Sequence, residues 1–243
     1  PLLAYGVSRF ARPRNELTAW SGAALGAEAS LALWHADKLL SERMVAASLA
    51  EVARLERIFS LFDAESELAR LNRDGKLENA SADLISVMRD SLRLGEASGG
   101  AFDVSVQPLW DVYAAHYSAR PDSATGPEER AIAEALARVD YRRIALDGST
   151  IRLTQKGMGV TLNGIAQGYI TDRVADMLRD AGFEHVVAEL GEIRAIGDHP
   201  EGRPWRMGIK DPAEPTQVAR MVEIVNEAVA VSVAGGEESG RLR

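Results

Sequence analysis

The residues best suited to bind a ligand lie in a glycine-rich stretch around positions 159–168. Gly159, Gly164 and Gly168 allow the backbone to approach another group closely, and an amphipathic helix is predicted to follow. Backbone N–H groups at such a place, together with the helix dipole, favour a phosphate or another anion. The pattern matches neither the Walker-A nor the dinucleotide-binding fingerprint. Two interpretations therefore stay open, a ligand site or close packing of the helix.

Two further places carry groups that suit a binding site. A carboxylate follows a double glycine in Gly99-Gly100-Ala101-Phe102-Asp103, where a tight turn is predicted. Asp103 either faces a ligand or caps the turn, and capping is the commoner role of Asp there. Phe62 precedes a predicted helix and is either a core residue or an aromatic wall for a planar ligand.

Composition argues against several classes of function. The net charge is -8, from 36 acidic and 28 basic side chains, so no strong positive field exists to attract nucleic acid. Cysteine is absent, which excludes disulfides, thiolate catalysis and cysteine-ligated metals. No apolar run of about 18 residues predicts a membrane span. Because the sequence starts at Pro1, we expect any initiator methionine or export signal to lie outside it.

Local patterns predict the elements that hold these residues. Residues 1–24 lack a period and are predicted to form an extended N-terminal arm. A strand buried on both faces is predicted at 28–35, and an amphipathic helix at 37–60. Ser66 and Ser81 are predicted to cap the next two helices, the second of which ends at Gly99-Gly100.

The rest of the chain mixes both kinds of element. The predictions are a strand over 104–106 ended by Pro108, a polar loop at 116–126, a helix over 127–139 with Ile132, Leu136 and Val139 facing inward, a hairpin around Asp147-Gly148-Ser149, a helix ended by Gly182, and strands at 185–190, 205–210, 218–225 and 228–232. This irregular mixture predicts an α+β fold with mixed or antiparallel sheets and packed helices. No segment reads as a linker, so residues 1–243 are predicted to form a single domain.

Five motifs stand in one order along the chain. They are Ser66-Glu67-Leu68 with Leu71-Asn72, Gly99-Gly100-Ala101-Phe102-Asp103 with Pro108-Leu109, Asn163-Gly-Ile-Ala-Gln-Gly-Tyr169 with Asp172-Arg173, Leu190-Gly191-Glu192 with Ile193-Arg194-Ala195, and Trp205 with Gly208-Ile209-Lys210-Asp211-Pro212. This order resembles the ApbE family of FAD:protein FMN transferases, over roughly residues 25–232. The resemblance implies a two-lobed, T-fold-like single unit.

The resemblance also implies a reaction. Such enzymes split FAD, their substrate, at its pyrophosphate, attach FMN through a phosphoester to a Ser or Thr of an acceptor flavoprotein subunit, and release AMP. Mg²⁺ spreads the developing charge in phosphoryl transfers of this kind. The resemblance further implies export to the periplasm, with a membrane reached only through a lipid anchor or a membrane-bound acceptor.

The family's site maps onto named positions. The resemblance places Leu25, Phe62, Ala101, Phe102, Asp103, Thr161 and Gln167 at the FAD. It places the backbone carbonyl of Gly164 on the metal, and it assigns no catalytic residue in this sequence.

Some positions depart from the family pattern. Thr161, Asn163 and Gln167 stand where the family often has Asp, Gly and Lys, and this variant is similar to a branch linked to maturation of nitrous-oxide reductase. Two later motifs, which supply metal-binding groups in the family, do not occur. We therefore expect tens of residues to be missing between about 232 and 233, in a loop that orders over metal and nucleotide.

Two alternative functions stay open. An FAD pyrophosphatase would use water in place of the protein hydroxyl. A flavin-binding or assembly protein without catalysis is favoured by the changes at Thr161 and Gln167.

Overall fold

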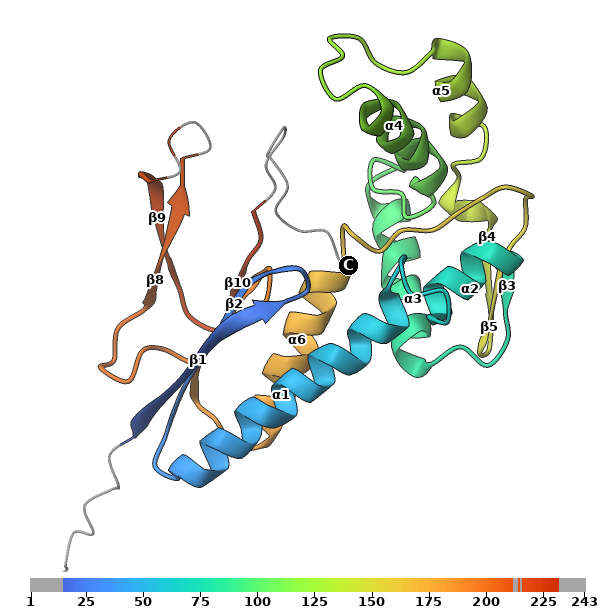
Figure 1. Cartoon of the computed structure of the whole chain (residues 1–243). Coiled ribbons are helices and arrows are strands. Elements are labelled where there is room, and N and C mark those ends of the chain that lie inside the picture. Colours follow the sequence, from blue (N-terminus) through green and yellow to red (C-terminus); the bar gives the residue numbers. More distant parts are fainter. Residues whose placement is uncertain (1–14, 212–213, 215, 232–243) are drawn as a thin grey trace, which may run out of the picture.

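The computed structural model describes residues 15–211, 214 and 216–231, which form an α+β arrangement with antiparallel sheets (Figure 1). In chain order the elements are β1 (Glu16–Ala24), β2 (Ala27–His35), α1 (Lys38–Phe59), α2 (Glu67–Asp74), β3 (Lys76–Leu77), α3 (Ala82–Ala97), α4 (Gln107–Ala119), α5 (Glu129–Leu136), the 3-10 helix η1 (Tyr141–Arg143), β4 (Ile144–Asp147), β5 (Thr150–Leu153), α6 (Ala166–Asp180), β6 (His185–Glu189), β7 (Ile193–Ile196), β8 (Trp205–Lys210), β9 (Val218–Ile224) and β10 (Ala228–Val229). The α+β prediction is confirmed.

A five-stranded sheet organises one side of the molecule. Its order is β1-β2-β6-β7-β10, and all neighbours are antiparallel. One face packs on α1 and α6, with Leu31 and Leu33 of β2 buried in the shared core. Each such leucine contributes about 1.5–3 kcal/mol by leaving water. On the other face, Trp34 meets Trp205 of the β8–β9 hairpin, with ring centroids 5.1 Å apart.

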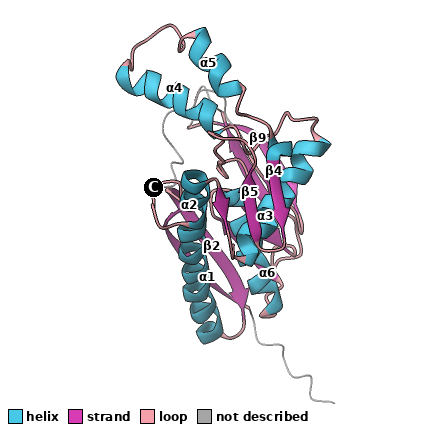
Figure 2. Ribbon diagram, turned by 90° about the vertical axis from the view of Figure 1, so that its right-hand side faces the viewer, coloured by secondary structure: helices cyan, strands magenta, loops and turns pink. Residues whose placement is uncertain are grey.

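A smaller sheet and the remaining helices form the other side. Its strand order is β3-β5-β4, next to α2 and α3. Figure 2 shows α4 and α5 side by side at one end of the molecule. The β4–β5 hairpin turns through Gly148, whose φ of 58° suits glycine, as predicted.

Local capping sets the helix starts, as predicted for Ser66 and Ser81. Asp37 Oδ1 accepts from the Leu40 N–H at 2.9 Å, and Ser66 Oγ accepts from the Ala69 N–H at 2.9 Å. Ser81 Oγ accepts from the Leu84 N–H at 3.2 Å. Each bond satisfies one of the free N–H groups in a first helical turn.

An ion-pair cluster ties α1 and α6 to α3. Asp83 of α3 accepts from Arg54 Nη2 at 2.8 Å and from the Tyr169 hydroxyl at 2.9 Å. Burial disfavours the charged form of Asp83, but these two hydrogen bonds, together with the positive charges of Arg54 and Arg173, outweigh it and hold the pKa of Asp83 below its usual value. Burial and the bond to Asp83 raise the pKa of Tyr169 to about 12. The cluster therefore joins the two sides of the molecule.

Several predicted elements are wrong in the first half of the chain. Residues 16–24 form the edge strand β1 instead of an arm, while the part of the predicted arm before residue 15 lies outside the described residues. β2 is buried on one face, since Ala32 and Trp34 on the other face are only half-buried. Between them the chain turns at Leu25-Gly26, where both φ angles are positive. A hairpin of this kind has no Asn-Gly signal in the sequence.

The second half differs at four places. The predicted strand over 104–106 is wrong, because Val106 makes only an isolated bridge to Gly159 and α4 starts at the next residue, Gln107. Helix α4 also runs through 119, so the first four residues of the predicted 116–126 loop are helical. Leu136 is 50% exposed instead of buried. Strand β7 was not predicted, because a four-residue strand after a turn carries too little pattern.

No helix within the described ranges is long and apolar enough to cross a bilayer.

Candidate functional site

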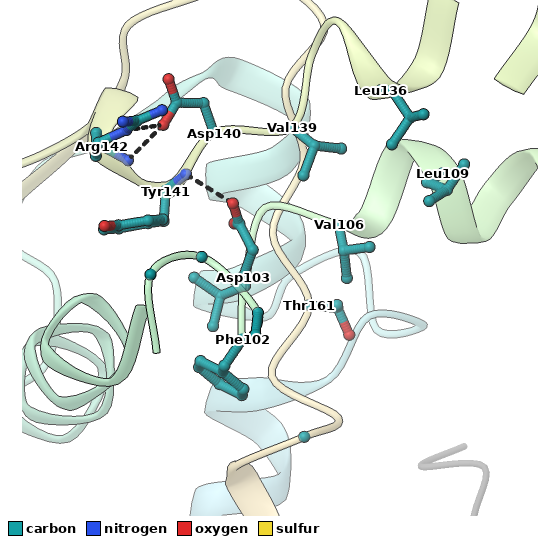
Figure 3. Close-up of a pocket in the computed structure, with 15 residues that line it drawn as sticks. Phe102, Asp103, Val106, Leu109, Leu136, Val139, Asp140, Tyr141, Arg142 and Thr161 are labelled. Atoms are coloured by element: carbon teal, nitrogen blue, oxygen red, sulfur yellow. Dashed lines mark hydrogen bonds and ion pairs between the residues drawn. The ribbon is translucent and has the colours of Figure 1, made fainter. Parts of the chain in front are cut away.

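A cavity of about 650 Å³ opens where the turn after α3, helices α4 and α5, η1 and the segment before α6 converge (Figure 3). It is lined by Ala101, Phe102, Asp103, Thr161 and Gly164, five of the positions that the resemblance implied. The first three lie about 60 residues from the last two along the chain, so only the fold brings them together. Figure 3 shows apolar side chains of α4 and α5 completing the opposite side.

The double glycine sets the course of the chain into this cavity. Gly99 and Gly100 have φ of 63° and 88°, a left-handed conformation that side chains other than glycine adopt at a cost. The Phe102 N–H then donates to Ser98 Oγ at 3.0 Å. This turn brings the Phe102 ring close to Gly164, where an added Cβ would lie 3.3 Å from Cε2 of the ring.

Asp103 caps the turn and also holds the cavity wall. Its Oδ1 accepts from the N–H and the hydroxyl of Ser105, at 2.8 and 2.6 Å. Its Oδ2 accepts from the Tyr141 N–H at 3.0 Å. Asp103 was predicted either to face a ligand or to cap the turn, and these hydrogen bonds show that it caps the turn. A direct contact with FAD stays a prediction.

A further wall, bonded to the turn through Asp103, comes from η1. Asp140 Oδ1 accepts from Arg142 Nε at 2.8 Å, and bonds from Arg142 lower the pKa of Asp140. The Tyr141 ring lies against Gly95 of α3, where an added Cβ would be 2.9 Å from the ring. Arg142 stands at the exposed rim, with its guanidinium carbon 5.8 Å from the Tyr141 ring centroid. A guanidinium at this place suits a phosphate.

Sequence reasoning missed this wall. Tyr141 and Arg142 line the cavity, as do the apolar side chains of Val106, Leu109, Leu136 and Val139. The available signal was an aromatic residue followed by two arginines between a helix and a hairpin. That signal indicates a cavity wall only when the hydrogen bond from the Tyr141 N–H to Asp103 is known.

Three predicted positions do not line the cavity. Leu25 is fully buried at the β1–β2 turn, where its N–H donates to Glu56 Oε1 at 2.7 Å. Phe62 is 65% exposed, so its alternative role as a core residue is wrong. Gln167 lies against the turn at Gly191, where an added Cβ would be 2.7 Å from its carboxamide. Their contacts with FAD stay predictions.

The described residues do not by themselves form a magnesium site. Among them, no three His, Cys, Asp or Glu side chains gather as metal ligands do. Mg²⁺ takes about six oxygen ligands, several of them water or substrate phosphate. The Gly164 backbone supplies at most one. The expected gap between 232 and 233 also lies outside the described residues.

Similar sequences are known from several bacteria. A FAD:protein FMN transferase of Vibrio cholerae is 32% identical over 177 residues, which cover 71% of this chain and 52% of that protein. One of Haemophilus influenzae is 32% identical over 192 residues, covering 76% and 54%. The chain therefore spans about half the length of the curated relatives it matches.

Solved structures and a family model give the same family as these relatives. The flavin transferase ApbE from Vibrio cholerae superposes with a TM-score of 0.76 at 27% identity, covering 94% of this chain and 75% of that one. Its H257G mutant gives 0.74 at 25% identity, covering 88% and 72%. The ApbE family model matches residues 25–238. That match covers most of the chain, including both segments that meet at the cavity, so the chain belongs to the ApbE family.

Proposed function

We propose that this protein transfers FMN from FAD to a Ser or Thr hydroxyl of an acceptor protein and releases AMP. The observation that carries the proposal is the convergence of Ala101–Asp103 with Thr161 and Gly164 on one cavity. Its volume of about 650 Å³ falls in the range of about 300–1,000 Å³ typical of small-molecule sites. The relatives' names support the same activity.

The cavity offers complementary surfaces for a dinucleotide. The half-buried Phe102 ring and the α4–α5 side chains suit a planar ring system. Arg142 at the rim suits a phosphate, because a guanidinium pairs with phosphate oxygens. Phosphoryl transfer depends mainly on such positioning and charge stabilisation.

The proposed reaction is a single displacement. The acceptor oxygen forms a bond to the phosphorus of the FMN half, and the bond from that phosphorus to the bridging oxygen of the pyrophosphate breaks. AMP leaves with that oxygen, and the hydroxyl proton passes to solvent or a base. We assign no base among the described residues.

Magnesium dependence belongs to the proposal and rests on the family resemblance. Among the described residues no three His, Cys, Asp or Glu side chains gather, so ligands besides the Gly164 carbonyl would come from the substrate phosphates and from residues outside the described ranges.

The acceptor and the compartment are part of the same proposal. We propose a flavoprotein subunit with a Ser/Thr flavinylation motif as acceptor, met in the periplasm. The similarity of Asn163-Gly-Ile-Ala-Gln-Gly-Tyr169 to the nitrous-oxide branch points to an acceptor in that pathway. Cell fractionation, with the protein in the cytoplasmic fraction, would contradict the compartment.

The test is to incubate the protein with FAD and an acceptor that carries the motif, with Mg²⁺ or with EDTA. We expect a covalently fluorescent acceptor and an equal amount of AMP, both only with Mg²⁺. FMN and AMP without labelling would indicate the pyrophosphatase instead. Tightly bound, unchanged FAD would indicate a flavin-binding protein.

A further inference from the structure

A side chain, and not a neighbouring strand, satisfies the backbone of Val160. Asn72 Nδ2 donates to the Val160 carbonyl at 2.8 Å, and the Val160 N–H donates to Asn72 Oδ1 at 2.7 Å. One carboxamide thus pairs with both polar groups of one residue, as a strand edge does. Val160 is fully buried, so these groups need partners inside the protein.

The opposite edge of the same segment is bonded to the turn that carries Asp103. The Thr161 N–H donates to the Val104 carbonyl at 2.8 Å, and Gly159 pairs with Val106 in a parallel bridge. Residues 159–161 therefore behave as the middle strand of a small sheet, with Asn72 on one edge and residues 104–106 on the other.

Asn72 stands on a firmly held support. It lies near the end of α2, which is closed by Gly75 at φ 69°, and the Gly75 carbonyl accepts from the Leu153 N–H at 2.8 Å. The other end of α2 is capped by Ser66. Because α2 is fixed at both ends, Asn72 has a fixed position. Its two hydrogen bonds therefore fix the position of residues 159–161.

We propose that Asn72 is a positioning residue for the ligand site, which by holding the Val160 peptide places Thr161 and Gly164 opposite Phe102. Asn72 itself does not line the cavity, so it acts through these residues. That the ligand is FAD rests on the proposed function.

The test compares variants of Asn72 with a matched asparagine elsewhere. Asn72→Ala removes both bonds, and Asn72→Asp keeps the shape but presents an oxygen to the Val160 carbonyl. Asn226 is the control, because its Oδ1 accepts from the Gly197 N–H at 2.7 Å, at the end of β7 away from the Gly191 turn. Measurements are the FAD dissociation constant by flavin fluorescence, kcat and KM for FAD, the melting temperature, and hydrogen exchange over residues 159–164.

We expect both Asn72 variants to raise the FAD dissociation constant and KM about tenfold, with a smaller change in kcat and faster exchange over 159–164. Asn226→Ala is expected to lower the melting temperature without changing FAD affinity. Unchanged affinity in a folded Asn72 variant, or an equal loss in Asn226→Ala, overturns the inference. If the native protein binds no FAD, the proposed function fails, and the positioning role is then decided by exchange: unaltered rates in the Asn72 variants overturn it.

Discussion

Asp103 and Tyr141, 38 residues apart in the chain, are joined by a hydrogen bond of 3.0 Å from the Tyr141 N–H to the Asp103 carboxylate. The bond fixes η1 against the turn after α3, and both segments line the cavity. A carboxylate that was expected at a ligand therefore has a structural task in the same place.

We predict that Asp103→Ala weakens both stability and FAD retention. Three donors lose their acceptor, and an unpaired, partly buried donor costs about 1–3 kcal/mol. We expect a lower melting temperature together with weaker binding, measured by thermal unfolding and FAD fluorescence.

The control is Asp111→Ala, which removes an exposed carboxylate of α4 bonded to Gln107. It is expected to leave both quantities nearly unchanged. Unaltered FAD affinity in Asp103→Ala would show that this wall does not shape the ligand site.

Gly164→Ala is predicted to reduce FAD affinity without loss of stability. The new Cβ would lie 3.3 Å from Cε2 of Phe102, tighter than an ordinary contact, so the ring must shift inside the cavity. We expect the FAD dissociation constant to rise by a factor of about 5–10, about 1–1.4 kcal/mol.

Gly168→Ala is the matched control, because no atom lies within 4 Å of its added Cβ. It lies inside α6, where replacing glycine by alanine stabilises a helix by about 0.5–1 kcal/mol. Equal FAD affinity in the two variants would argue against Gly164 at the ligand.

The Asp83 cluster predicts loss of stability in acid. The pKa of Asp83 is lower in the fold than in the unfolded chain, so its stabilisation is present above the unfolded pKa of about 3.9 and disappears as pH falls through the folded value. Asp83→Asn should therefore flatten the decline in unfolding free energy below about pH 5.

Asp90→Asn, on the same helix, removes a carboxylate from the exposed ion pair with Arg93. Exposed pairs contribute about 0–1 kcal/mol, so the acid decline should keep its slope. Urea unfolding between pH 3 and 7 provides the measurement. A steep acid decline that persists in Asp83→Asn would assign it to other carboxylates.

Elements whose signals are local were predictable from the sequence. Ser66 and Ser81 bond to N–H groups three residues ahead, and Gly148 turns a two-strand hairpin, so a short window contains the whole cause. Strand β1 was missed for the opposite reason. It is an exposed edge strand with no apolar alternation, and only its pairing with β2 makes it a strand.

The site residues also fall into a group that the sequence predicted and a group that it did not. Ala101–Asp103, Thr161 and Gly164 were found through motifs, and the fold brings them together. Tyr141 and Arg142 escaped prediction because their place depends on a bond to a residue far away in the sequence. The resemblance places Leu25 and Gln167 at the ligand, and in this structure Leu25 fills the core while Gln167 covers Gly191, so their contacts with FAD stay predictions.

The central claim is that one cavity between Phe102, Thr161 and Gly164 receives FAD. A crystal structure of the protein soaked with FAD tests it most directly. We predict electron density for the dinucleotide inside this cavity, in contact with the Phe102 ring and the Gly164 backbone. Density for FAD at another surface, with this cavity holding only water at saturating FAD, would contradict the account.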